Sequence, residues 1–298
     1  MTLQPGAAPT GRSARIVVLT LLAMAAFAGN SLLCRMALKQ TQIDPASFTA
    51  IRLVSGAATL WLVVGLRRGL PQGRGNWPSA LALFVYAAGF SFAYLSLTAA
   101  TGALLLFGAV QATMIGHGIW SGERLHRLQL AGLALALAGL VGLLLPGLAA
   151  PPMGAAALML SAGVAWGVYS LRGKGRGDPT RVTAGNFLRA VPIALLLPVL
   201  LPDRVALDGA GVWYAVASGT LASGLGYAIW YTALPALRAT SAASVQLSVP
   251  VLAALGGVLF LGETVSPRLI LCSACVLGGI ALVILARQLR VAYDRRHD

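Results

Sequence analysis

Ten long apolar segments, separated by short stretches rich in proline, glycine and arginine, constrain this chain more than any other feature. A helix needs about 20 apolar residues to cross a bilayer, and each segment is close to that length. Only 10% of the 298 residues are charged, whereas soluble domains carry about 25%. The sequence therefore predicts an all-α integral membrane protein with spans near 15–34, 46–66, 77–98, 100–120, 126–146, 153–172, 182–201, 209–231, 239–261 and 268–287.

The basic residues are distributed unevenly among the connections. With a cytoplasmic N-terminus, the cytoplasmic segments hold 16 Lys and Arg residues and the opposite loops hold four. Because basic loops stay in the cytoplasm, we predict that both termini are cytoplasmic. Arginine outnumbers lysine by 20 to 2, which is typical of a GC-rich bacterium and favours its inner (cytoplasmic) membrane. We interpret the net charge of +14 as a topology signal beside anionic lipid and expect no nucleic-acid partner.

A Gly-Glu pair follows the fourth segment and recurs after the ninth, 140 positions later, in a chain with only 8 acidic residues. Five spans separate Glu123 from Glu263, so the two should lie on opposite sides of the membrane. Two half-units of opposite orientation are typical of secondary transporters. The pattern predicts two inverted five-helix repeats, residues 1–148 and 149–298, around a central cavity. We expect each glutamate to cap a helix end or bind a neighbouring loop.

Longer stretches around these pairs, SGERLHRLQLAGLALALAG (121–139) and LGETVSPRLILCSACVLGG (261–279), are similar to each other. Together with the five-plus-five spans, they resemble the EamA-like branch of the drug/metabolite transporter superfamily over essentially the whole chain. Within that branch, AMAAFAGNSLLCRMALK (23–39) and AGVAWGVYSLRGKG (162–175) are most similar to bacterial amino-acid exporters of the YddG type. The resemblance implies alternating access to a central cavity and export of aromatic and other neutral amino acids.

Polar and aromatic side chains inside the spans are the candidates for a binding site. A neutral amino acid needs acceptors for its ammonium, donors for its carboxylate and an apolar pocket for its side chain. For the carboxamides and hydroxyls the alternative role is hydrogen bonding between helices, and for the aromatic rings it is packing. The substrate-binding candidates are Asn30, Tyr86, Tyr94, Gln111, Trp166, Tyr169, Tyr227, Ser244 and Gln246.

Two local patterns refine this set. Trp166 and Tyr169 are three residues apart and should share a helix face, beside the small-residue motif Gly163-x-x-x-Gly167. Pro250 cannot donate to the carbonyl of Gln246, so we predict a helix break there that frees this carbonyl for a ligand or water.

Arg52 and Arg189 are the only charged residues well inside the spans. Snorkelling or pairing with backbone carbonyls is one interpretation, and for Arg52 the other is that it binds a substrate carboxylate. The mid-membrane region holds no acidic residue. This argues against an exporter that binds cations at a buried carboxylate, weakens proton antiport, and leaves facilitated diffusion or exchange open.

The sequence contains no motif for an enzyme, metal or cofactor. There is no P-loop and no HExxH, and Cys272-x-x-Cys275 has no His, Asp or third Cys near it, so we expect these cysteines to pack helices. We predict a transporter that is not an enzyme, with no cofactor and no metal. A drug, nucleoside or other metabolite exporter of the same fold, or a lipid-handling membrane protein, remains the alternative. The oligomeric state stays open, a monomer included.

Overall fold

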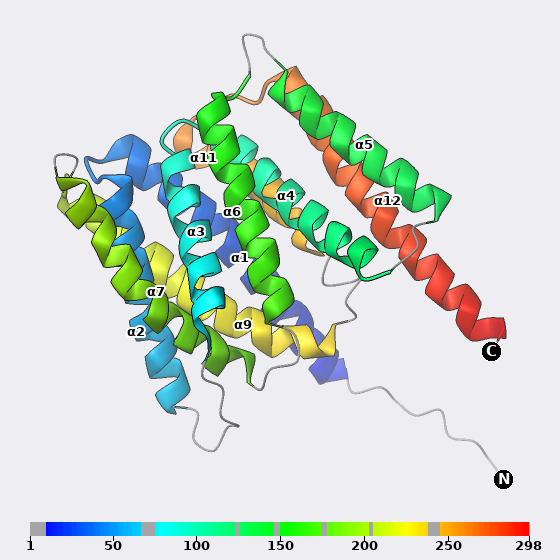
Figure 1. Cartoon of the computed structure of the whole chain (residues 1–298), viewed down its shortest axis with the longest axis horizontal. Coiled ribbons are helices and arrows are strands. Elements are labelled where there is room, and N and C mark those ends of the chain that lie inside the picture. Colours follow the sequence, from blue (N-terminus) through cyan, green and yellow to red (C-terminus); the bar gives the residue numbers. More distant parts are fainter. Residues whose placement is uncertain are drawn as a thin grey trace.

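The computed structural model describes residues 10–66, 75–122, 126–145, 150–173, 178–202, 205–237 and 245–297, which form ten helical rods (Figure 1). One rod is composite, because α8, the π-helical segment η2 and α9 follow one another without a break. The elements are α1 (Thr10–Gln40), α2 (Pro45–Leu66), α3 (Trp77–Ala93), α4 (Ala99–Trp120), α5 (Arg127–Leu144), α6 (Met153–Arg172), α7 (Pro179–Leu200), α8 (Gly209–Ala217), η2 (Ser218–Leu225), α9 (Gly226–Ala233), the short 3₁₀ helix η3 (Leu234–Ala236), α11 (Ser248–Leu261) and α12 (Pro267–His297).

The predicted all-α membrane fold is confirmed. Among the described helices, seven are long and apolar enough to cross a membrane, and α3 and α11 are shorter apolar helices. Some boundaries differ from the prediction: α3 ends at Ala93 and not near 98, and α7 begins at Pro179 and not near 182. Residues 238–244, the predicted start of the ninth span, lie outside the described residues.

Asp-Pro pairs set the starts of α2 and α7. The carboxylate of Asp44 accepts hydrogen bonds from the backbone N–H groups of Ala46 and Ser47, both at 2.9 Å. Asp178 likewise accepts from Thr180 N–H at 3.1 Å. An aspartate satisfies orphan N–H groups at a helix start, and proline suits the first turn because its missing N–H would be unpaired there. The second helix of each predicted half therefore begins in the same way.

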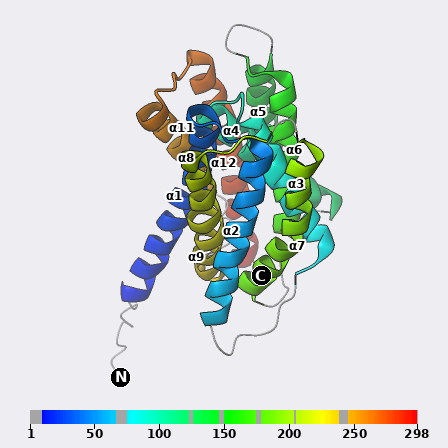
Figure 2. The same ribbon diagram turned by 90° about the vertical axis from the view of Figure 1, so that its left-hand side faces the viewer.

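Helices from the two halves of the chain pack against each other. The most extensive contacts join α5 with α12, α3 and α4 with α6, and α2 with both α7 and η2, and α1 also packs against α9 and α11. In Figure 1, α5 and α12 form an antiparallel pair that is inclined to the other helices and touches them mainly through α4. The start of α1 and the end of α12 lie toward the same end of the molecule (Figure 2).

Small residues allow close helix contacts. A Cβ on Gly163 would lie 2.6 Å from the carbonyl oxygen of Leu106, and one on Gly167 would lie 2.8 Å from Cβ of Thr113. The motif Gly163-x-x-x-Gly167 therefore packs α6 onto α4. Between α5 and α12, a Cβ on Gly139 would lie 2.7 Å from Cβ of Cys275, which confirms that this cysteine lies in a helix contact.

The contact between α5 and α12 predicts opposite effects for two adjacent glycines. Gly279 lies against the Gly132 backbone, whereas a Cβ at Gly278 would meet nothing within 4 Å. We expect Gly279→Ala to lower the free energy of unfolding by about 1–3 kcal/mol through overpacking. Gly278→Ala is the matched control and should be neutral or stabilising, because alanine favours a helix. Thermal unfolding in detergent measures both, and equal melting temperatures would contradict the packing.

Candidate functional site: a central aromatic cavity

A small cavity lies at the centre of the helices, with side chains from α1, α3, α4, α6, η2 and α9 and that of Gln246 in its wall. Its volume is about 20 Å³, which is room for about one water, whereas small-molecule pockets occupy about 300–1,000 Å³. Five of the predicted site residues line it: Asn30, Tyr86, Trp166, Tyr227 and Gln246. The structure thus brings these residues together in a conformation that is closed around them.

Aromatic rings form a large part of the cavity wall. The ring of Trp166 lies 4.8 Å from that of Tyr86 and 5.0 Å from that of Tyr227, measured between centroids. Trp166 also stacks on Tyr169 at 5.4 Å with an interplanar angle of 24°, so their predicted common face is confirmed. Phe27 adds an edge contact to Tyr227 at 5.8 Å. Such a wall suits an apolar or aromatic group.

Arg52 lies directly behind this wall and is 1% exposed. Its Nε donates to Ser223 Oγ at 3.2 Å, and its Nη2 donates to the Tyr86 hydroxyl at 3.1 Å. The guanidinium carbon lies 5.0 Å from the ring centroid of Phe90 and 5.3 Å from that of Tyr86. Arg52 therefore does not snorkel to the membrane surface, and that interpretation of the sequence was wrong.

One nitrogen of the Arg52 guanidinium makes no hydrogen bond to the described residues. Nη1 is buried and has no hydrogen-bond partner within the described part of the chain. The one ion pair among the described residues joins Arg35 and Glu263, so no described carboxylate balances Arg52. A buried charge without a counterion is costly, which makes Arg52 a candidate functional residue in a membrane protein. Arg189, by contrast, donates to the backbone carbonyl of Gly185 at 2.8 Å, as the sequence interpretation expected.

Asn30 connects α1 to the same group of residues. Its Nδ2 donates to the Tyr86 hydroxyl at 3.2 Å, and its Oδ1 accepts from Ser218 Oγ at 2.7 Å. All three side chains are buried. The Tyr86 hydroxyl oxygen thus accepts from both Arg52 and Asn30, and one hydrogen-bonded network joins α1, α2, α3 and η2.

Sequence reasoning missed the contribution of η2. This π-helical segment begins at Ser218, the partner of Asn30, and includes Ser223, the partner of Arg52. It lies close against α2, since a Cβ on Gly219 would collide with Ser55 and the backbone carbonyl of Arg52. π-Helical turns are rare and often mark functional sites. The run of small residues SGTLASGLG inside the eighth span (218–226) is the signal that could have indicated it.

Comparison with known proteins identifies the family. The pattern of the EamA-like transporter family matches residues 153–285. An uncharacterized protein of Pseudomonas aeruginosa is 60% identical over 281 residues, which are 94% of this chain and 98% of that protein. The chain belongs to the EamA-like transporter family. A solved crystal structure aligns with this transporter over 92% of its chain and 99% of the other, with a TM-score of 0.65 and 24% identity, and this likeness concerns the fold alone.

The EamA-like transporter also matches part of a named exporter. The threonine/homoserine exporter RhtA of Salmonella typhimurium is 29% identical over 131 residues, 41% of this chain and 42% of RhtA. The Escherichia coli protein of the same name is 28% identical over 130 residues, 41% of this chain and 42% of that exporter. The alignment thus spans about two fifths of each exporter.

Several predicted site residues of the EamA-like transporter lie away from the cavity wall. Gln111 lines a separate, mostly apolar pocket between α4, α5 and α12. The Tyr94 ring packs on Gly102, and its hydroxyl donates to the Ala99 carbonyl at 3.4 Å. Tyr169 stacks on the far side of Trp166 and is not part of the cavity wall. Its hydroxyl donates to Thr183 Oγ1 and accepts from Asn186 Nδ2.

Three other predictions concern residues that lie outside the described parts of the chain or close to their ends. Ser244 and Glu123 lie outside the described residues. Pro250 lies in the first turn of α11, which begins at Ser248 after a turn at Leu247. A proline is readily accepted there, since the first helical N–H groups have no partner within the helix. The helix therefore starts close to the predicted break, and the role of the Gln246 carbonyl toward a ligand stays a prediction.

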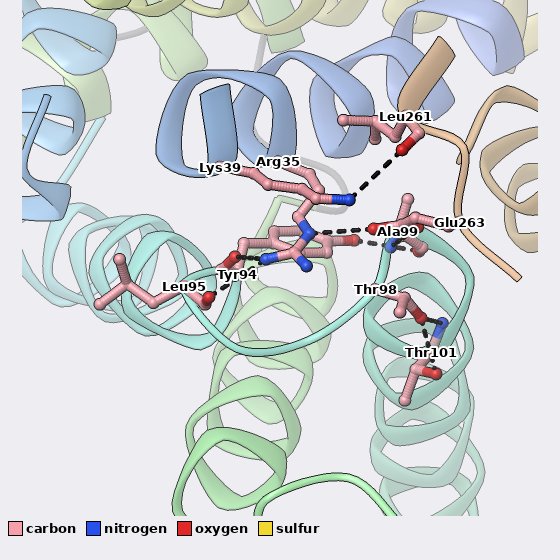
Figure 3. A network of polar contacts seen from close by, with 9 residues as sticks. All are labelled: Arg35, Lys39, Tyr94, Leu95, Thr98, Ala99, Thr101, Leu261 and Glu263. Atoms are coloured by element: carbon pink, nitrogen blue, oxygen red, sulfur yellow. Dashed lines mark hydrogen bonds and ion pairs between the residues drawn. The ribbon is translucent and has the colours of Figure 1, made fainter. Parts of the chain in front are cut away.

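Glu263 organises a second polar group, the Glu263 cluster, which we define as Arg35, Lys39, Tyr94, Leu95, Ala99, Leu261 and Glu263 (Figure 3). Its Oε2 accepts from the Ala99 N–H at 2.8 Å, at the start of α4, and its Oε1 pairs with Arg35 Nε at 2.9 Å. Arg35 Nη1 also donates to the carbonyls of Tyr94 and Leu95, just beyond α3. Glu263 therefore caps a helix, as predicted, and ties α1, α4 and the end of α11 together.

The glycine before each glutamate adopts a left-handed backbone conformation at the end of a helix. Gly262 ends α11 with φ +60°, and Gly122 follows α4 with φ +89°. A left-handed residue commonly ends a helix, and glycine adopts this conformation without a Cβ penalty. The repeated Gly-Glu pair is thus a helix-ending glycine followed, at Glu263, by the cap of another helix.

Proposed function

We propose that this EamA-like transporter exports neutral amino acids, aromatic ones included, across the bacterial inner membrane. The observation that carries the proposal is the buried Arg52, whose Nη1 has no partner among the described residues, beside an aromatic cavity. The substrate carboxylate would bind the guanidinium, and its side chain would pack against Trp166 and Tyr227. The partial similarity to a threonine/homoserine exporter supports the same substrate class.

Transport would follow alternating access between two inverted halves, residues 1–148 and 149–298. The interleaved packing of the two halves supports this arrangement, because rocking of one against the other would open the central cavity to either side. The small cavity volume supports it as well, since an amino acid would enter only after such an opening. Because none of the described residues that line the cavity is acidic, we propose a facilitator or exchanger.

The substrate claim is tested by counterflow in proteoliposomes. Vesicles loaded with unlabelled phenylalanine and containing the purified protein should accumulate labelled phenylalanine and threonine well above vesicles without protein. Labelled nucleosides, a dye and a fluorescent phospholipid are tested in parallel. Movement of one of these without any amino-acid flux would contradict the proposal and favour a drug, nucleoside or lipid-handling function.

Trp166 predicts how selectivity depends on the aromatic wall. We expect Trp166→Leu to raise KM for phenylalanine about fivefold, because an aromatic contact contributes about 0.5–1.5 kcal/mol beyond burial. KM for threonine, which has no ring, should change less than twofold. The matched control is Trp61→Leu, since Trp61 is 67% exposed on the outside of α2. An equal change for both substrates would assign Trp166 to packing.

The proposed orientation has its own test. In a variant with Cys34, Cys272 and Cys275 changed to alanine, a cysteine is placed at the exposed Thr264 or at the exposed Ser121. A thiol reagent that cannot cross membranes should label Thr264→Cys in intact cells and Ser121→Cys only in inverted vesicles. The reverse pattern would place both termini outside.

A further inference from the structure

The surroundings of the central cavity are chemically asymmetric, because the cation Arg52 lies directly behind the lining residues Tyr86 and Phe90 and no described anion lines the cavity. Among the residues whose side chains the structure describes, the acidic ones lie at helix ends: Asp44, Asp178 and Asp208 precede helices, and Glu263 follows α11. None of them lines the cavity. Arg52, by its contacts with Tyr86 and Phe90, is the formal charge directly behind the cavity wall, and its charge attracts an anion and repels a cation.

The hydrogen bonds around Arg52 favour the same kind of ligand. Nη1 offers N–H groups that have no acceptor in the described chain. The nearest oxygens already accept hydrogen bonds: the Tyr86 hydroxyl accepts from Arg52 and Asn30, and Asn30 Oδ1 accepts from Ser218. The network thus has donors to spare on the side of Arg52, and a carboxylate is the acceptor that a guanidinium fits best.

An ammonium group finds much weaker partners here. The groups of the cavity wall left for it are the faces of Trp166 and Tyr227, the hydroxyl of Ser31 and the carboxamide of Gln246, none of which carries a charge. Cation–π contacts of this kind are modest, and the positive charge of Arg52 opposes them. The carboxylate of an amino acid should consequently contribute most to its recognition, and the ammonium should contribute little.

We propose that this transporter also carries aromatic monocarboxylates that have no amino group, such as 2-hydroxy and 2-oxo acids with an aryl side chain. Their carboxylate binds Arg52 Nη1, and their ring takes the place against Trp166 and Tyr227. Aromatic amines, which carry the cation alone, are excluded. The inference rests on the site of the proposed amino-acid function, and it makes the anion the required group.

The test compares three ligands that differ in one group each. Proteoliposomes with the full-length protein are assayed for uptake of labelled phenylalanine, of 3-phenyllactate, in which a hydroxyl replaces the ammonium, and of phenethylamine, which lacks the carboxylate. Protein-free vesicles correct for passive entry. We expect saturable 3-phenyllactate uptake with a KM within about fivefold of that for phenylalanine, mutual competition between the two, and no effect of phenethylamine.

Each outcome separates this inference from the amino-acid proposal. Phenylalanine uptake without uptake of, or competition by, 3-phenyllactate would overturn the inference and leave amino-acid export standing. Uptake of 3-phenyllactate alone would support the inference and contradict amino-acid export. Carrier-mediated uptake of phenethylamine would overturn the inference, because it would show that the cavity accepts a cation.

Discussion

Arg52→Gln is expected to lower kcat/KM for phenylalanine by about 10- to 100-fold. Glutamine keeps a donor for the Tyr86 hydroxyl or for Ser223 but removes the charge. A hydrogen bond to a charged group contributes about 1.5–3 kcal/mol, and each 1.4 kcal/mol is a factor of ten in affinity. Counterflow of labelled phenylalanine in proteoliposomes measures the effect. The matched control is Arg189→Gln, which removes another arginine within a span and should retain more than half of the activity.

The same variant distinguishes a substrate-binding role from a structural one. Because no described carboxylate pairs with Arg52, its charge is not part of a buried ion pair whose loss would destabilise the fold. We expect the melting temperature of Arg52→Gln in detergent to be unchanged or higher than that of the wild type, since desolvation of the charge is relieved. A large fall in the melting temperature that accounts for the lost transport would assign Arg52 to the fold.

Glu263→Leu is expected to destabilise the protein strongly. The change removes the acceptor for the Ala99 N–H and leaves Arg35, whose side chain is 12% exposed, without its carboxylate. Breaking a buried ion pair from one side costs about 3–5 kcal/mol. We expect the lower end of this range, because Arg35 keeps its bonds to the carbonyls of Tyr94 and Leu95. Thermal unfolding in detergent measures the loss.

Three further variants separate the contributions within the Glu263 cluster. Glu263→Gln keeps an oxygen for the Ala99 N–H and should lose less stability than Glu263→Leu. Arg35→Met combined with Glu263→Leu removes both charges and should recover part of the loss. Lys39→Met removes only a 3.3 Å bond to the Leu261 carbonyl and should be close to neutral. Equal losses for Glu263→Gln and Glu263→Leu would contradict the helix-capping role.

The sequence predicted the spans and the local geometry but not the rotation of each helix. Long apolar runs, proline breaks and the Gly-Glu pairs are local signals. The structure confirms the all-helical fold, the common face of Trp166 and Tyr169, and the capping role of Glu263. In lipid, however, the outward face of a helix is as apolar as its inward face, so hydrophobic periodicity does not tell which side chains reach the centre. Gln111 and Tyr94 are therefore candidates by sequence, but in the structure Gln111 lines another pocket and the Tyr94 ring packs on Gly102.

The surroundings of Arg52 illustrate the second limit of the sequence. Its partners Tyr86 and Ser223 lie 34 and 171 positions away in the sequence. Ser223 is placed by the π-helical segment η2, and the small residues of that segment do not reveal which helix it packs against. Depth alone suggested that the guanidinium could reach the membrane surface. Its burial follows from the packing of η2 and α3 around α2, which is a tertiary property.

The most direct test of the account asks whether both sides of the membrane reach one central site. Ser31, which lines the cavity and is 1% exposed, is changed to cysteine in the variant without Cys34, Cys272 and Cys275. A thiol reagent that cannot cross membranes should label this cysteine both in right-side-out and in inverted vesicles. Phenylalanine should slow the labelling at least fivefold in each. Labelling from one side only, or labelling that phenylalanine does not affect, would contradict alternating access around this cavity.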